Sequence, residues 1–173
     1  VDRLLKSPVK QRGRDFAVML KSLAELGYAL EWRVINAAEY GMPQRRRRIY
    51  LVGYHESTPL YKKLKKSSKQ KWLLSDGIIA DAFPVENSGE MLSFKLENDL
   101  ISVSGKFNLG KTQSPFKNGG VMIDGEIFTQ KLNAVHNGTY MVLGDILEKG
   151  EVDEDYYIEK ISEKKWEYLK GAK

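Results

Sequence analysis

Residues 28–54 read YALEWRVINAAEYGMPQRRRRIYLVGY, and this stretch decides the fold. The first part, 28–36, is rich in aromatic and β-branched side chains that partly alternate with polar ones, which predicts a strand. A second run, 48–54, is apolar on both faces, which predicts a buried strand. The loop between them contains Gly41 and Pro43, which are typical of turns. We therefore predict two strands joined by a loop that ends in four arginines.

An amphipathic helix precedes the first strand. Apolar side chains recur at helical spacing from Arg14 to Leu26, and Gly27 is a typical residue for ending a helix. Helix, strand, loop and strand make half of an α/β unit, and two strands alone do not form a stable sheet. We therefore expect an α/β fold whose remaining strands are absent from the chain.

The pattern changes after His55. The lysine-rich run 62–71 predicts a mobile surface segment or linker. Residues 121–128 predict a hairpin, because Asp124 and Gly125 suit the positive φ angles of a type I′ turn. Further predicted elements are a short helix over 72–83 capped by Ser75 or Asp76, short strands over 91–132, a helix over 143–147 and a terminal helix over 162–170.

Composition restricts the function classes. The chain has 173 residues, of which 42% are hydrophobic, and a net charge of +5, which favours an anionic partner such as nucleic acid. It contains no cysteine and two histidines, which excludes a cysteine nucleophile, a disulfide and a Cys- or His-rich metal site. No run approaches the roughly 18 to 20 apolar residues of a membrane span. We expect a cytoplasmic protein without a metal, and, because it begins at Val1 without a methionine, an excerpt of a longer chain.

Four consecutive arginines stand at the entrance to the second strand. Side chains alternate in an extended chain, so Gln44, Arg46 and Arg48 would point one way and Arg45 and Arg47 the other. Guanidinium groups suit phosphate oxygens and the acceptor edges of bases. A solvated charge run or a localisation signal is the alternative. The preceding turn and the following apolar strand place the arginines at a defined position, which favours nucleic-acid binding.

Residues 36–53 resemble a conserved block of the cytosine-C5 DNA methyltransferases, written A-x-x-Y/F-G-x-P-Q-x-R-x-R and followed by an apolar strand. The resemblance covers residues 1–54, where 1–5 are similar to the residues that follow the family's Glu-Asn dipeptide. It returns at residues 139–158, which contain TYMVLGDIL and VDEDYYI, and residues 166–173 fit the same region. Residues 55–138 match no general block and occupy the stretch in which members differ by the DNA sequence that they recognise.

This resemblance implies a fold in three parts. Residues 1–54 would be the C-terminal portion of a class I S-adenosylmethionine-dependent methyltransferase domain, with a helix and the last two strands. Residues 55–138 would be an irregular α+β variable region, and residues 139–173 the passage into the target-recognition domain. The parent enzyme would be a bacterial DNA methyltransferase of the restriction-modification type.

The resemblance also implies a chemistry. The family flips a cytosine out of duplex DNA, a cysteine thiolate attacks C6, a glutamate holds N3, and the methyl group passes from S-adenosylmethionine to C5. Arg46 and Arg48 would be the paired arginines near the flipped base and its phosphates, and Gln44 would orient the loop, with Arg45 as a weaker DNA contact. The nucleophile and the Gly-rich cofactor loop are absent. We therefore expect no cofactor-binding residue here and no activity from this chain alone.

Other residues allow more than one interpretation. Lys117 and Asn118 would lie in a recognition loop that reaches base edges, or in an ordinary turn. His55 and His136 are predicted to have no catalytic role, and Trp32, Trp72 and Trp166 are predicted to pack in the core. Two alternatives remain for the function. One is a non-enzymatic basic module that binds nucleic acid, and the other is a split methyltransferase completed by a second subunit.

Overall fold

The computed structural model describes residues 2–160 and 162–165. The chain divides into two compact units, of which the first ends at Met141 and the second begins at Val142. The first unit contains the sheets and the helices that pack on them.

A five-stranded sheet with the order β2-β1-β5-β6-β4 organises the first unit, and each pair of its strands is antiparallel. β1 (Tyr28–Asn36) and β2 (Arg47–His55) pair along their whole length, which confirms the two predicted strands. The other strands of this sheet are β4 (Leu92–Lys95), β5 (Gly119–Ile123) and β6 (Glu126–Gln130), while β3 (Val85–Asn87) and β7 (Leu132–Ala134) form a second, two-stranded sheet.

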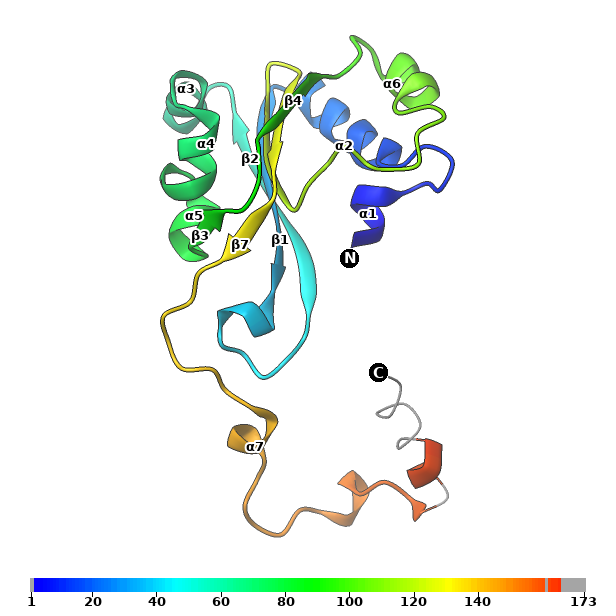
Figure 1. Ribbon diagram of the computed structural model, residues 1–173, viewed down its shortest axis with the longest axis vertical. Coiled ribbons are helices and arrows are strands. Elements are labelled where there is room, and N and C mark those ends of the chain that lie inside the picture. The colour runs from blue at the N-terminus through cyan, green and yellow to red at the C-terminus, as the bar shows by residue number, and fades with distance from the viewer. Residues whose placement is uncertain (1, 161, 166–173) are drawn as a thin grey trace. The chain divides into compact units, whose positions relative to one another are not determined.

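Helices cover both faces of the larger sheet (Figure 1). The two faces follow from alternation along β1, because Leu30 and Trp32 enter one core and Ala29 enters the other. α1 (Asp2–Lys6), α2 (Arg14–Glu25) and α6 (Leu100–Lys106) lie on the first face, and α3 (Pro59–Lys66), α4 (Lys69–Lys71), a π-helical turn η2 (Trp72–Asp76) and α5 (Ile78–Ala82) lie on the second. The first unit is therefore a mixed α/β structure in three layers.

Two local predictions are confirmed by the backbone. α2 occupies the predicted helix and buries Phe16, Ala17 and Leu20, and Gly27 follows its end with a φ of 82°. In the hairpin between β5 and β6, Asp124 has a φ of 51° and Gly125 a φ of 76°, as the predicted type I′ turn requires.

The lysine-rich run was predicted to be mobile, and this prediction is wrong. It forms α3 and α4, because Thr58 caps α3 by accepting a hydrogen bond from the amide of Tyr61, and Leu64 is fully buried. Lys65 pairs with Asp124 at 2.8 Å. Lys69 Nζ donates to three carbonyls near the end of α3, those of Leu64, Lys65 and Ser67. Several of these lysines therefore contribute to folding.

The region 55–138 was predicted to be an irregular α+β region with short strands over 91–132, and it contains helices together with β4, β5 and β6, which belong to the main sheet. β5 pairs with β1, with Leu30 opposite Met122, so the chain itself supplies further strands to the sheet that contains β1 and β2. The functional boundary proposed at residue 54 lies inside the first unit. α6 was not predicted. The predicted helix over 72–83 is interrupted at Gly77. Gly77 is the N-cap residue of α5, and no side chain caps this helix, in contrast to the expected cap by Ser75 or Asp76.

β2 is an edge strand of the described sheet, and Tyr54 is its only buried residue, so the predicted burial on both faces is wrong. Tyr54, near its end, is only 3% exposed because the α3–α5 layer covers it. Tyr50, nearer the beginning of β2, is 47% exposed. The half of β2 that lies next to the arginines, with Tyr50, is therefore accessible.

A buried polar network ties β1 to the α3–α5 layer. Glu31 accepts hydrogen bonds from Tyr54 Oη at 2.7 Å and from Trp72 Nε1 at 3.0 Å. Arg33 donates to the carbonyls of Leu73 at 2.6 Å and Phe83 at 3.1 Å. Burial raises the pKa of the Glu31 carboxyl and lowers the pKa of Arg33. Arg33 therefore holds the segment that leads into β3 against the sheet.

We expect the substitution Gly120→Ala to destabilise the first unit by about 3 kcal/mol, the upper end of the usual cost of overpacking. A Cβ at this position would lie 2.1 Å from Trp32 Cζ2 and 2.7 Å from the carbonyl oxygen of Phe128. Urea unfolding measures the cost. Gly105→Ala in α6 is the control, because no atom lies within 4 Å of its Cβ and alanine favours a helix. Equal stability of the two variants would contradict this packing.

The second unit contains the helix α7 (Leu143–Ile146), which confirms the helix predicted over 143–147, and a 3-10 turn, η3 (Glu154–Tyr156). Residues 162–165 are helical, and the rest of the predicted terminal helix, with Trp166, lies outside the described residues. No helix in the described parts of either unit has the length and apolar character to cross a membrane.

Candidate nucleic-acid interface

Four consecutive arginines, Arg45 to Arg48, form what we call the arginine block. It lies at the end of the sheet where β1 ends and β2 begins (Figure 1). Between them the chain forms a 3-10 turn, η1 (Ala37–Tyr40), and passes through Gly41 with a φ of 81°. A Cβ on Gly41 would lie 2.5 Å from His136 Nε2 and 2.7 Å from the carbonyl oxygen of Thr139. Gly41 therefore permits both the turn and the close approach of residues 136–139.

The arginines divide between the two faces of the sheet. Arg48 is opposite Ile35, and Arg47 is opposite Asn36, so these two arginines face opposite ways, as predicted. Gln44 and all four arginines, Arg45 to Arg48, are exposed. The structure therefore presents guanidinium groups on both sides of the end of the hairpin.

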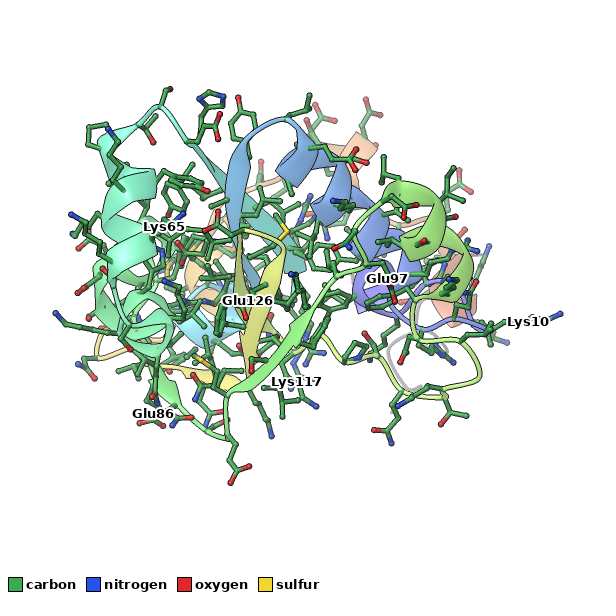
Figure 2. All side chains as sticks on the ribbon, turned by 90° about the horizontal axis from the view of Figure 1, so that it is seen from above. Lys10, Lys65, Glu86, Glu97, Lys117 and Glu126 are labelled. Atoms are coloured by element: carbon green, nitrogen blue, oxygen red, sulfur yellow. The ribbon has the colours of Figure 1, made fainter. Side chains whose placement is uncertain are left out.

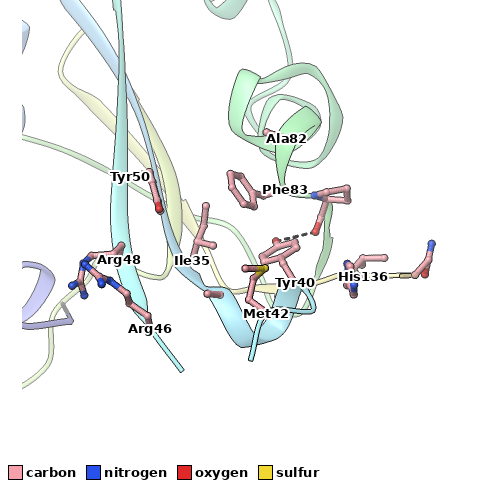
Figure 3. A pocket seen from close by; sticks show the side chains of 13 residues that line it. Ile35, Tyr40, Met42, Arg46, Arg48, Tyr50, Ala82, Phe83 and His136 are labelled. Atoms are coloured by element: carbon pink, nitrogen blue, oxygen red, sulfur yellow. Dashed lines mark hydrogen bonds between the residues drawn. The ribbon is translucent and has the colours of Figure 1, made fainter. Parts of the chain in front are cut away.

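A pocket of about 620 Å³ lies on the Arg48 face, and we call it the aromatic pocket. The ring of Phe83 meets Tyr40 edge-on at 5.2 Å and stacks with Tyr50 at 6.1 Å between centroids. Tyr40 Oη donates to the carbonyl oxygen of Pro84 at 3.0 Å (Figure 3). The lining residues are Ile35, Ala37, Tyr40, Met42, Arg46, Arg48, Tyr50, Ala82, Phe83, Pro84, Val135, His136 and Asn137.

The pocket combines flat apolar walls with two guanidinium groups at its edge. In Figure 3, the side chains of Arg46 and Arg48 extend away from the group of Tyr40, Met42 and Phe83. Aromatic walls suit stacking against a planar ring, and exposed guanidinium groups suit bidentate bonds to phosphate. Phe83 and His136 were not predicted to line a site, because they are distant from the arginines in sequence and belong to no motif there.

Asn118 and Lys117 occupy the other face of the sheet. The amide of Asn118 donates to the carbonyl of Leu132 at 2.7 Å and accepts from its N–H at 2.9 Å, and the carbonyl of Asn118 accepts from Val34 N. Asn118 thereby links its own segment to β1, through Val34, and to the start of β7, through Leu132. The side chain of Lys117 is exposed, while its N–H donates to Thr129 Oγ1. Base recognition by this pair stays a prediction.

Trp32 and Trp72 are fully buried, which confirms the prediction that they pack in the core. His55 bonds to Ser57, and His136 lies beside the aromatic pocket. Within residues 2–160 and 162–165, no cluster of His, Cys, Asp and Glu residues has an arrangement that would hold a metal ion.

Comparison with known proteins identifies the family. A model of the C-5 cytosine-specific DNA methylases matches residues 1–165. The chain belongs to this family. The resemblance inferred from the arginine block is thereby confirmed.

Several curated relatives of this methylase chain are Type II methyltransferases. M.Sau3AI of Staphylococcus aureus is 41% identical over 176 residues, which cover 100% of this chain and 41% of the relative. M.NlaIV of Neisseria lactamica is 40% identical over 80 residues, or 46% of this chain and 19% of the relative. The chain therefore spans about two fifths of the length of M.Sau3AI. No solved structure matches it.

The family implies the use of S-adenosylmethionine, but the aromatic pocket does not fit this cofactor. The cofactor carries an ammonium group, a sulfonium group and ribose hydroxyls, for which carboxylates are natural partners. No carboxylate lines the pocket, so no acidic side chain there could pair with the two positive groups.

Proposed function

We propose that this chain is the DNA-contacting part of a bacterial, cytoplasmic cytosine-C5 DNA methyltransferase of the restriction-modification type. The observation that supports this most directly is the exposed arginine block at the end of the β1–β2 hairpin, beside the aromatic pocket. In this proposal residues 1–54 form the C-terminal portion of a class I methyltransferase domain. Residues 55–138 form a variable region, and residues 139–173 lead into the target-recognition domain.

The arginines act on the nucleotide that the enzyme takes out of the duplex. Arg46 and Arg48 reach its phosphates and the edge of its base, and Gln44 orients the loop that carries them. The chain has no cysteine, so the nucleophile that attacks C6 belongs to another part of the enzyme. S-adenosylmethionine supplies the methyl group when it is bound elsewhere. This chain therefore grips and orients DNA without performing the transfer.

A comparison of the isolated chain with the full-length protein tests this proposal. Each is incubated with duplex DNA and S-adenosylmethionine labelled in its methyl group, and the label in DNA is counted. We expect transfer by the full-length protein and none by the isolated chain, although both bind DNA. Restoration of transfer by a second polypeptide would identify a split enzyme. Methyl transfer by the cysteine-free chain alone would contradict the proposal.

A non-enzymatic module that binds nucleic acid is the second candidate, since exposed arginines also grip phosphate without catalysis. The same experiment separates the two functions. DNA binding by the full-length protein without any methyl transfer would favour the module and overturn the enzyme.

A further inference from the structure

Three lysines from distant parts of the sequence meet on the face of the hairpin opposite the aromatic pocket. Lys6 ends α1, Lys117 precedes β5, and Lys131 lies between β6 and β7. Together with Arg47 they line a cavity of about 280 Å³, which we call the basic groove. Each of the four side chains is exposed at the surface. The fold thus gathers charges that no local sequence pattern groups together.

Positively charged side chains outnumber acidic ones in the lining of the groove. Four cationic side chains line it, and Glu39 is the one acidic residue in its lining. Glu39 Oε1 also accepts a hydrogen bond from Asn36 Nδ2 at 3.2 Å. A neighbouring hollow is lined by Arg45 to Arg48 together with the same Asn36 and Glu39, so the basic surface continues into the arginine block. Such a surface attracts an extended anion.

The backbone beneath the groove is held in place. The N–H of Val34 donates to the carbonyl of Asn118 at 2.7 Å, and the Asn118 amide makes both of its bonds to the backbone of Leu132. These bonds join β1 to the residues next to Lys117 and Lys131. The chain therefore positions these two lysines beside Arg47 before any ligand arrives.

Lys117 and Lys131 differ from Lys65 and Lys69, whose ammonium groups have partners within the fold. Lys65 pairs with Asp124, and Lys69 donates to three carbonyls. Lys117 and Lys131, in contrast, form no ion pair with a residue that the structure describes. Lys117 and Lys131 line the same groove, and an anion bound there would offset the repulsion between their charges.

We propose that the basic groove binds backbone phosphates of duplex DNA, next to those gripped by Arg46 and Arg48. The proposal rests on the proposed function, which makes DNA the partner, and adds a second contact on the opposite face of the hairpin. S-adenosylmethionine carries no phosphate, so DNA is the source of the anion. The groove positions the duplex without reading its sequence, because phosphates are the same at every base pair.

The salt dependence of DNA binding tests the groove. The variant replaces the three lysines together, Lys6→Gln, Lys117→Gln and Lys131→Gln, in the full-length protein. The control removes three exposed lysines elsewhere, Lys10→Gln, Lys62→Gln and Lys66→Gln, and Figure 2 shows Lys10 and Lys117 on separate parts of the surface. Binding to a 30-base-pair duplex of arbitrary sequence is measured between 50 and 200 mM salt. A third variant replaces the three groove lysines by arginine.

Each phosphate contact contributes about 0.9 to the slope of log affinity against log salt. We expect the glutamine variant of the groove to flatten this slope by more than one unit beyond the control, and the arginine variant to keep the original slope. A difference from the control of one unit or less, or an equal loss in the arginine variant, would overturn the proposal. Absence of both DNA binding and methyl transfer in the unchanged protein would instead count against the proposed function.

Discussion

Replacing Arg48 by alanine in the full-length enzyme is expected to lower the rate of methyl transfer by about 100-fold or more, the usual effect of losing a preorganised donor at a reacting centre. Arg48 lies beside the aromatic pocket and is opposite Ile35, in the strand register that places it on that face. Non-specific DNA binding should weaken only slightly, because many other cations of the surface remain.

Single-turnover rates and binding to an arbitrary duplex, measured on the same variant, separate these effects. Arg45→Ala is the control, since Arg45 precedes β2 and does not line the aromatic pocket. We expect it to lower the rate of methyl transfer far less than Arg48→Ala does. Equal fractional losses of rate and of binding in Arg48→Ala would reduce Arg48 to an ordinary phosphate contact.

The substitution Arg33→Met should destabilise the first unit by about 3 to 5 kcal/mol, the usual cost of removing one partner from a buried charged network. Arg33 is buried, and its loss leaves the carbonyls of Leu73 and Phe83 without their donor and Glu31 without its neighbouring cation. Because Phe83 forms a wall of the aromatic pocket, the change also loosens that wall.

Chemical denaturation measures this loss. Arg14→Met is the matched control, because Arg14 pairs with Asp15 near the surface, where ion pairs contribute about 1 kcal/mol or less. If Arg33→Met unfolded at the same denaturant concentration as Arg14→Met, Arg33 would not be the tie between β1 and the second helical layer.

Local patterns were sufficient to predict some of the fold. The spacing of apolar residues in α2, the two strands around the arginines and the Asp124-Gly125 turn all depend on neighbours within a few residues. The pairing of β5 with β1 could not be predicted in this way, because it joins residues about 90 positions apart and no motif marks it. The same limit explains the error over α3, whose burial of Leu64 depends on a distant sheet.

The residues of the candidate site show the same difference between local and distant patterns. Arg46 and Arg48 were predicted from a compact motif, and alternation alone indicated that Arg47 faces the other way. Phe83 of the aromatic pocket and Lys131 of the basic groove became visible only in the folded chain, where distant segments return to the end of the hairpin. Base contact by Asn118 stays a prediction, and its side-chain amide is bonded to the backbone of Leu132.

The most direct test of the central claim is to identify the base atom that receives the methyl group. Duplex DNA is incubated with the full-length protein and S-adenosylmethionine bearing a deuterated methyl group, then digested to nucleosides and analysed by mass spectrometry. We predict that the label appears in 5-methylcytosine. Label confined to N4-methylcytosine or to N6-methyladenine, or absent from DNA to which the protein binds, would contradict the assignment of this chain to a cytosine-C5 enzyme.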